Sequence, residues 1–240
     1  MTESQTSHRL PPRVITLIYG AAVLGSALLL IAAWTQHLPL NRMEAVGFVA
    51  GAWCVWLAVK QNIWNWPIGI ANNIAYIVVF WHARLYADMS LQGIYIAISL
   101  YGWYSWLFGG VQRHSLRVAQ VTMPVAAALA AVSVPATWGL TLYLRSVHDA
   151  APFLDALTTV MSLCAQYLLA RKQIENWYVW IAADVIYLWL YTARGLYLTT
   201  LLYFIFMLMC VAGAKEWRGE LKRQEEAAAA GSLRSVGRTA

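Results

Sequence analysis

The chain has 240 residues, of which 60% are hydrophobic and only 12% are charged. That charged share is about half the share of an average soluble domain, so the composition excludes an ordinary water-soluble globular protein. The net charge of +6 comes without a basic patch interleaved with polar residues, so we expect no nucleic-acid partner.

Eight apolar blocks follow one another along the chain, most of them near twenty residues long. About 20 residues are needed for a helix to cross the ~30 Å hydrocarbon core of a bilayer. We therefore predict an all-α membrane protein with about eight transmembrane helices. The first block follows Arg9 and Arg13, but it is too long for a signal peptide and has no convincing cleavage site, so we expect it to be retained. The blocks lie at 14–34, 44–60, 66–83, 89–109, 119–144, 155–170, 177–193 and 196–214.

The basic residues between the blocks predict the orientation of the chain. Eleven Lys and Arg residues fall on one side of the membrane and four on the other, and cytoplasmic loops are the ones enriched in these residues. We expect a multi-pass protein of the bacterial inner (plasma) membrane with both termini in the cytoplasm. The minority set is Arg42, Arg84, Arg145 and Arg194; the majority set is Arg9, Arg13, Lys60, Arg113, Arg117, Arg171, Lys172, Lys215, Arg218, Lys222 and Arg223.

An internal repeat appears when the chain is aligned with itself. Residues 44–106 align without a gap with 155–217, and 15 of the 63 pairs are identical. The shift between the two segments is 111 positions, and we call it the repeat offset. Because the identities include the pairs Asn65–Asn176 and Trp66–Trp177, they are not explained by apolar composition alone. Self-similarity of this kind predicts two related bundles of three helices.

One helix separates the two predicted bundles, so the second bundle has the same membrane orientation as the first. A parallel repeat of this kind is typical of transporters with a central site between the halves, although a duplicated bundle could also be a scaffold. The predicted organisation is an N-terminal segment with the first helix (1–43), the first three-helix repeat (44–109), a linker helix (110–154), the second three-helix repeat (155–217) and a polar cytoplasmic tail (218–240) that frays after a short helical extension.

Polar and aromatic residues share one face in three of the predicted helices. In the seventh span Trp177, Trp180, Asp184 and Tyr187 occupy positions i, i+3, i+7 and i+10, which fall on one helical face. The equivalent positions of the third span are Trp66, Gly69, Asn73 and Tyr76, and Asn72 is the sequence neighbour of Asn73. The fourth span continues the pattern with Gln92, Tyr95, Ser99, Trp103 and Trp106.

Asp184 lies near the middle of its span, where an ionised carboxylate is costly unless it is paired, hydrated or facing a cavity. One interpretation is a ligand contact at the midplane, and the other is a protonated or hydrogen-bonded aspartate that holds helices together. Asn72, Asn73 and Gln92 have the same two interpretations, because amides also bridge membrane helices.

The aromatic residues divide into two predicted groups. We expect Trp34, Trp64, Trp106 and Trp217, near span ends, to be interfacial anchors. Trp103 and Trp180 lie deeper on the polar face, where they would suit a flat, cationic heteroaromatic ligand.

Sequence motifs for catalysis, metal binding and ATP hydrolysis are missing from the chain. It has no phosphate-binding G-x-x-x-x-G-K-[ST] loop, no H-E-x-x-H and no G-x-S-x-G. The isolated Cys54, Cys164 and Cys210 lie inside apolar blocks, as small core residues do. We therefore expect no catalytic residue, no metal and no cofactor.

Three segments resemble the PnuC family of nicotinamide riboside transporters. They are EAVGFVAG (44–51), QGIYIAISLYGWYSW (92–106) and RKQIENWYVWIAADVIYLWLYTARGLY (171–197). The runs Y-G-W-Y-x-W and N-W-x-x-W-x-x-x-[ND] carry the resemblance, which covers about residues 43–218. It implies a core of three, one and three helices around a central site for a vitamin-like substrate.

The resemblance further implies uptake of nicotinamide riboside by facilitated diffusion, with a cytoplasmic riboside kinase trapping the substrate for NAD synthesis. It is compatible with a homo-oligomer. Carried over by position, the resemblance adds Tyr101 to the candidate contacts. The predicted substrate-binding residues are then Asn72, Asn73, Gln92, Tyr101, Trp103, Trp177, Trp180, Asp184 and Tyr187.

Two positions depart from the nicotinamide riboside pattern. Ser99 stands where an Asn is expected, and Asp184 stands where some relatives carry Asn. Relatives of this fold resemble carriers of thiamine or riboflavin. Thiamine therefore remains an alternative substrate, with riboflavin behind it because riboflavin is neutral.

Overall fold

The computed structural model describes residues 12–35, 42–82, 84 and 86–239, and the elements in them are helical. The described elements are α1 (Pro12–Trp34), α2 (Arg42–Val59), α3 (Asn65–His82), α4 (Tyr86–Phe108), a short 3₁₀ helix η1 (Val111–Arg113), α5 (Met123–Ser146), α6 (Pro152–Ala170), α7 (Glu175–Ala193) and α8 (Tyr197–Thr239). The predicted all-α fold and its eight long helices are confirmed. The expected segment ahead of the first span, with Arg9, lies outside the described residues.

The chain divides into two compact units, Met1–Val49 and Ala50–Ala240. In the first unit, α1 presents large apolar side chains such as Leu24, Leu28 and Ile31 on an exposed surface. The second unit holds the later part of α2 and all of α3 to α8.

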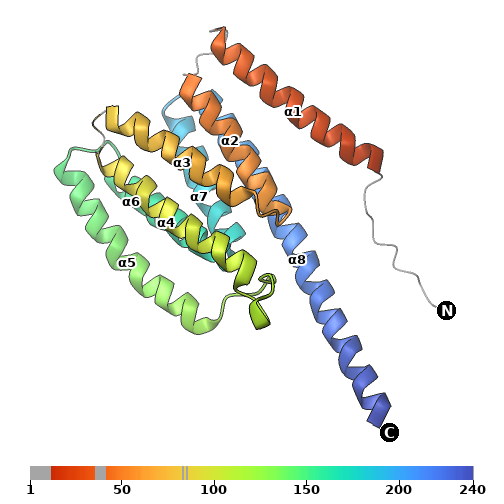
Figure 1. Cartoon of the computed structure of the whole chain (residues 1–240). Coiled ribbons are helices and arrows are strands. Elements are labelled where there is room, and N and C mark those ends of the chain that lie inside the picture. The colour runs from red at the N-terminus through yellow and green to blue at the C-terminus, as the bar shows by residue number, and fades with distance from the viewer. Residues whose placement is uncertain (1–11, 36–41, 83, 85, 240) are drawn as a thin grey trace. The chain divides into compact units, whose positions relative to one another are not determined.

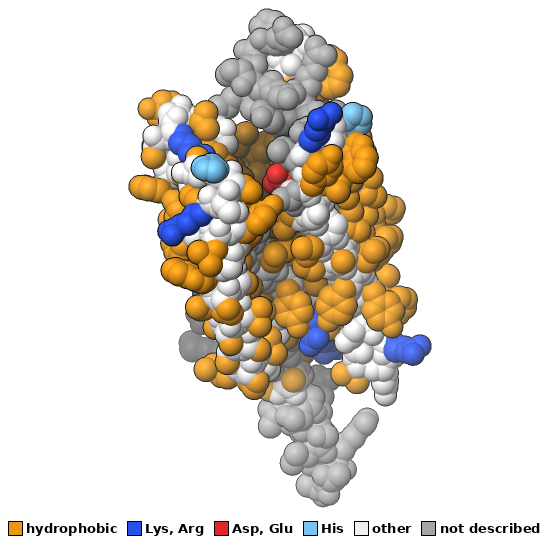
Figure 2. All heavy atoms as spheres, turned by 90° about the vertical axis from the view of Figure 1, so that its left-hand side faces the viewer, with side chains coloured by type: hydrophobic (Ala, Val, Ile, Leu, Met, Phe, Trp, Pro, Cys, Tyr) orange, Lys and Arg blue, Asp and Glu red, His pale blue; other side chains and the backbone are white. Residues whose placement is uncertain are grey.

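The surface of the second unit is apolar in a way that suits lipid. On α5 the side chains of Val132, Val134 and Trp138 are all more than 60% exposed. Figure 2 shows one face on which hydrophobic side chains cover the middle, while Lys and Arg side chains lie toward the two ends. Among the described helices, the segments Met123–Ser146, Pro152–Ala170 and Thr199–Ala230 are long and apolar enough to cross a bilayer by length and composition alone. The chain is a membrane protein.

Within the second unit the helices pack mostly as sequence neighbours. α3 packs on α4, α7 on α8, and α6 on α7, α5 and α4 (Figure 1). The later part of α2 lies along α8 (Figure 1), where the indole nitrogen of Trp217 donates a hydrogen bond of 3.2 Å to the carbonyl oxygen of Ala58. α6 therefore joins the α3–α4 pair to the α7–α8 pair, and α5 is attached to the bundle through α6.

Tight connections reverse the chain at corresponding places in the two halves. Gln61 and Lys172 follow α2 and α6 with φ angles of 53° and 51°, and Arg84 and Gly195 follow α3 and α7 with φ angles of 59° and 72°. A left-handed residue after a helix is a common way to end it and turn the chain. The repeat offset relates Gln61 to Lys172 and Arg84 to Gly195, so the two halves use the same turns.

Four tryptophans form the buried centre of one end of the bundle. Trp66 and Trp106 meet edge to face with ring centroids 5.3 Å apart, and Trp177 and Trp217 meet in the same way at 5.4 Å. All four side chains are at most 3% exposed. The prediction that Trp106 and Trp217 are interfacial anchors was wrong, because each ring packs against a tryptophan of its own half and donates a hydrogen bond across the bundle.

Those hydrogen bonds are reciprocal between the two halves. The indole nitrogen of Trp106 donates to the carbonyl oxygen of Leu169 at 3.0 Å, and that of Trp217 donates to the carbonyl oxygen of Ala58. The repeat offset relates Ala58 to Leu169, just as it relates Trp106 to Trp217. We keep the two three-helix repeats and their boundaries as a proposal, which these matched contacts support.

The tail after Glu220 stays helical through Thr239, beyond the short extension expected from the sequence. Side-chain pairs one turn apart support this part of α8. Arg223 contacts the carboxylate of Glu220 at 2.8 Å and Lys222 contacts that of Glu226 at 3.9 Å. Such pairs add a few tenths of a kcal/mol each to an exposed helix that is already rich in alanine.

Candidate substrate-binding cavity

A cavity of about 430 Å³ lies inside the second unit, between α2, α3, α4, α6, α7 and α8. This volume is within the usual range for small-molecule sites. The residues that line it form a regular pattern: the repeat offset relates each of the ten from the second half to a lining residue of the first half. The pairs are Gly51–Ser162, Val55–Gln166, Ala58–Leu169, Trp66–Trp177, Gly69–Trp180, Asn73–Asp184, Tyr76–Tyr187, Gln92–Tyr203, Tyr95–Phe206 and Ser99–Cys210.

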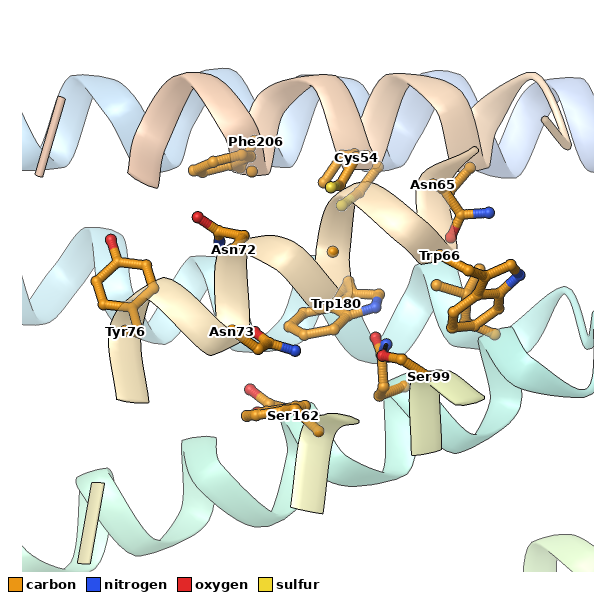
Figure 3. A pocket seen from close by; sticks show the side chains of 18 of the residues that line it. Cys54, Asn65, Trp66, Asn72, Asn73, Tyr76, Ser99, Ser162, Trp180 and Phe206 are labelled. Carbon is orange, nitrogen blue, oxygen red and sulfur yellow. Dashed lines mark hydrogen bonds between the residues drawn. The ribbon is translucent and has the colours of Figure 1, made fainter. Parts of the chain in front are cut away.

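The first half contributes amides to the cavity wall. Asn72 and Asn73 come from the middle of α3, and Gln92 comes from the second turn of α4. In Figure 3 the Asn73 side chain points into the space that Trp180, Ser99 and Ser162 also face. Amides can donate and accept at once, so this wall suits a ligand with a carboxamide or hydroxyl groups.

The second half contributes aromatic rings and one acid. Trp180 and Tyr187 line the cavity from α7, and Tyr203 and Phe206 line it from α8. The Tyr187 and Tyr203 rings lie 4.7 Å apart. This wall therefore offers flat apolar surface together with phenolic hydroxyl groups.

Asp184 supplies the one carboxyl group among the described lining residues. Its side chain is 5% exposed, and the thiol of Cys210 donates a long hydrogen bond of 3.7 Å to its Oδ2 atom. Among the described residues that line the cavity, Asp184 is the one acid, and none is Lys, Arg or His. If the carboxylate is ionised, these lining residues contain no cation to balance it, so a cationic ligand would be attracted.

One end of the cavity is closed by buried side chains. Trp66 and Trp177 line it there, and both are at most 2% exposed. Beyond them lie the α2–α3 and α6–α7 connections, which hold Gln61 and Lys172. The Lys172 ammonium donates to the carbonyl oxygen of Leu116 at 2.9 Å and to Oε1 of Gln61 at 3.3 Å.

Lys172 is unusually enclosed for a lysine in a connection between helices. Its residue is 7% exposed, and the ammonium lies 4.6 Å from the centroid of the Trp106 ring. Burial lowers the pKa of Lys172 to about 8, and the nearby Glu220 carboxylate opposes part of that change. The side chain therefore links the α2–α3, α4–α5 and α6–α7 connections at the closed end.

Seven of the nine predicted site residues line the cavity: Asn72, Asn73, Gln92, Trp177, Trp180, Asp184 and Tyr187. The structure places the other two outside its lining. Tyr101 is 41% exposed, and its hydroxyl accepts a hydrogen bond of 3.1 Å from Arg171. Trp103 packs against the buried tryptophan core, one turn beyond Ser99, where the cavity has already ended.

No group of three or more His, Cys, Asp or Glu side chains that could hold a metal ion occurs among the described residues. The polar groups of the cavity are amides, hydroxyls, indole N–H groups, two thiols and one carboxyl group. They can bind and orient a small molecule through hydrogen bonds and charge.

Comparison with known proteins identifies the family. A family model described as nicotinamide mononucleotide transporter matches residues 41–219. The chain belongs to this transporter family. It is 29% identical over 204 residues to the nicotinamide riboside transporter PnuC of Escherichia coli (strain K12), with 74% of this chain and 85% of the relative aligned. The resemblance predicted from the sequence motifs is therefore confirmed.

Other relatives are named as transporters of nicotinamide riboside or of riboflavin. The chain is 26% identical over 202 residues to the nicotinamide riboside transporter PnuC of Neisseria mucosa, covering 77% of this chain and 75% of the relative. It is 25% identical over 186 residues to the riboflavin/roseoflavin transporter RibM of Streptomyces davaonensis, covering 76% and 86%. The fold matches a crystal structure of the vitamin B3 transporter PnuC with a TM-score of 0.63 at 23% identity, covering 84% of this chain and 92% of that one.

Several lining residues were not predicted from the sequence. Tyr203, Cys210, Ser162 and Gln166 all line the cavity, yet they lie on stretches of α6 and α8 that read as plain apolar spans. The repeat offset was the signal that could have found them. Applied to Gln92 it gives Tyr203, and applied to Ser99 it gives Cys210.

Proposed function

We propose that this chain carries nicotinamide riboside across the membrane by facilitated diffusion. The observation that supports this most is the cavity: one carboxylate, several amides and aromatic rings, and no basic residue among the described lining residues. Nicotinamide riboside is a positively charged flat ring with a carboxamide and a ribose. Each of these parts has a chemical counterpart in the cavity wall.

The proposed binding site consists of the seven predicted residues that line the cavity. Asp184 would attract the ring cation, and Trp180 and Tyr187 would offer π faces to it. Asn72, Asn73 and Gln92 would exchange hydrogen bonds with the carboxamide and the ribose hydroxyls. Trp177 would form the closed end beneath the ligand.

The same residues favour the riboside over its phosphorylated form, the mononucleotide. Proteins bind phosphate with Arg or Lys side chains or with the N–H groups at helix N-termini. The described lining residues include no Lys, Arg or His, and they include Asp184, which would repel a phosphate. We therefore favour riboside transport over mononucleotide transport, although the family description names the mononucleotide.

Net uptake by such a carrier needs no energy source in the chain itself. A cytoplasmic riboside kinase would phosphorylate the arriving substrate, and the product would be retained for NAD synthesis because the cavity disfavours phosphate. The carrier would lie in the bacterial inner membrane with both termini in the cytoplasm, as the distribution of Lys and Arg favours. A homo-oligomer is compatible with this function.

Thiamine is the second candidate substrate. It is also a cationic heteroaromatic, so Asp184 and Trp180 suit it as well. Riboflavin is supported by the similarity to RibM, but its neutral ring would gain nothing from the charge of Asp184. The chain could also serve as a membrane scaffold, in which case the cavity would bind none of these vitamins.

Direct binding to the purified protein distinguishes these candidates. Calorimetric titrations with nicotinamide riboside, nicotinamide mononucleotide, thiamine and riboflavin should give the tightest binding for the riboside. Asp184→Asn should weaken riboside binding about tenfold, because an amide keeps hydrogen bonds but removes the charge. Trp180→Ala should weaken it by a similar factor, because a stacking surface is lost.

Tyr101→Phe is the matched control, since its hydroxyl lies outside the cavity lining, and its affinity should equal that of the wild type. In liposomes the protein should equilibrate the riboside without changing it chemically. Selective binding of thiamine with no response to the riboside would reject the substrate assignment. A lack of binding to all four compounds would favour the scaffold.

A further inference from the structure

The contact between Asp184 and Cys210 is unusual for a buried carboxylate. Both residues are at most 5% exposed, and the Sγ atom lies 3.7 Å from Oδ2. A thiol is a weak hydrogen-bond donor. The carboxylate is therefore removed from bulk water while this neighbour offers it little in exchange.

The corresponding pair in the first half of the chain is different. The repeat offset relates Asn73 and Ser99 to Asp184 and Cys210, and all four residues line the cavity. Ser99 has a hydroxyl, which hydrogen-bonds more strongly than a thiol, and it accepts a bond of 3.4 Å from Gln166. At the positions related by the repeat offset, the first half thus has an amide and a hydroxyl where the second half has an acid and a thiol.

A hydroxyl beside Asp184 would make a stronger bond than the thiol does. Hydrogen bonds to a charged acceptor are among the stronger ones in proteins, so a serine would satisfy part of the carboxylate before any ligand arrives. A ligand cation would then have to share or replace that bond, and its affinity would fall. The thiol fills nearly the same volume, and its long bond of 3.7 Å to Oδ2 competes with a ligand only weakly.

We propose that Cys210 is a specificity-determining residue of the cavity: its thiol packs beside Asp184 while leaving the carboxylate available to a cationic ligand. This inference rests on the proposed function, because it assumes that the ligand is a cationic vitamin. Cys210 acts through Asp184 and is therefore a positioning residue. Its expected effect is on the preference for a charged ring over an uncharged one.

The test compares two forms of one ligand that differ in charge. Nicotinamide riboside has a cationic ring, and its reduced dihydro form has an uncharged ring of nearly the same shape. Affinities for both are measured by titration with the wild type, Cys210→Ser, Cys210→Ala, Asp184→Asn and the double variant Asp184→Asn with Cys210→Ser.

We expect Cys210→Ser to weaken binding of the cation about three- to tenfold while changing binding of the uncharged form less than about twofold. Cys210→Ala adds no donor, so it should keep the wild-type preference for the cation. In the Asp184→Asn background the serine should have no charge-dependent effect, because its target is no longer a carboxylate.

A role of Cys210 in packing alone would change the affinities for both forms equally, and would do so most in Cys210→Ala. That result, or a Cys210→Ser protein with the wild-type preference, overturns the inference. If Cys210→Ser does not fold, loss of the cation preference in Cys210→Ala overturns it instead. If the wild type ignores nicotinamide riboside, the proposed substrate is wrong, and the same variants are compared with thiamine, where equal affinities in wild type and Cys210→Ser overturn the role of Cys210.

Discussion

The side chain of Lys172 shows how a single residue can be misjudged from the sequence. In the sequence it is one more cation of a cytoplasmic connection, counted beside Arg171. In the structure it is 7% exposed and its ammonium lies between Leu116, Gln61 and the Trp106 ring. The position of Lys172 in a loop predicts on which side of the membrane it lies. Its burial depends on the α2–α3 and α4–α5 connections, which come to lie against it only when the chain folds.

The lowered pKa of Lys172 makes stability depend on pH in a definite direction. With a pKa of about 8 in the folded protein and 10.5 ordinarily, the unfolded chain binds more protons between these values, so this group's contribution to stability rises with pH from about 8 to 10.5. Below about pH 8 Lys172 is protonated in both the folded and the unfolded protein, so the destabilisation caused by its buried charge does not change with pH.

The measurement is the melting temperature of the wild type relative to Lys172→Met, which removes the titrating group. The melting temperature of the wild type should rise relative to that of Lys172→Met as the pH rises from 8 to 10.5. The corresponding change in the free energy of unfolding is at most about 3 kcal/mol. A difference that stays flat over this interval would show that Lys172 does not titrate there.

At the scale of the elements, two helix pairs depend on a glycine beneath a tryptophan. A Cβ atom on Gly102 of α4 would overlap the Trp66 ring of α3, and one on Gly213 of α8 would come within 2.6 Å of the Trp177 ring of α7. Both rings are buried, so they cannot turn away from an added methyl group. These glycines therefore set the close approach of α3 to α4 and of α7 to α8.

Gly102→Ala should destabilise the folded protein by about 1–3 kcal/mol, the usual cost of overpacking a core. Gly93→Ala is the matched control on the same helix, because a Cβ atom there meets nothing within 4 Å. The control should be neutral or slightly stabilising, since alanine favours helix more than glycine does. Thermal unfolding in detergent measures both, and equal melting temperatures would contradict the packing argument.

The helices themselves were predictable from the sequence, but the burial of several side chains inside the protein was not. Apolar length identified every long helix, and the spacing of Trp180, Asp184 and Tyr187 predicted a face that lines the cavity. Trp106 and Trp217 were misplaced because a tryptophan near the end of a span resembles an interfacial anchor. What buries them is the partner ring and the carbonyl group across the bundle, and neither is visible in one span alone.

At the scale of the whole molecule, the orientation in the membrane is still a prediction from charge. α5 gives a direct test, because Arg117 precedes it, Ser146 ends it, and both residues are exposed. In intact cells a membrane-impermeant maleimide should label Ser146→Cys from outside and reach Arg117→Cys only after permeabilisation. Labelling with the reverse preference would invert the topology, and equal labelling of both would mean that α5 does not cross the bilayer.

The reciprocal bonds of Trp106 and Trp217 also bear on how the closed end could open. Each half supplies one donor and one acceptor there, so moving either half breaks both bonds together. The transition is therefore expected to be concerted between the halves. Neutral hydrogen bonds contribute only about 1 kcal/mol each, so in the proposed carrier these two bonds would add little to the cost of opening this end, beside the cost of exposing its four buried tryptophan rings.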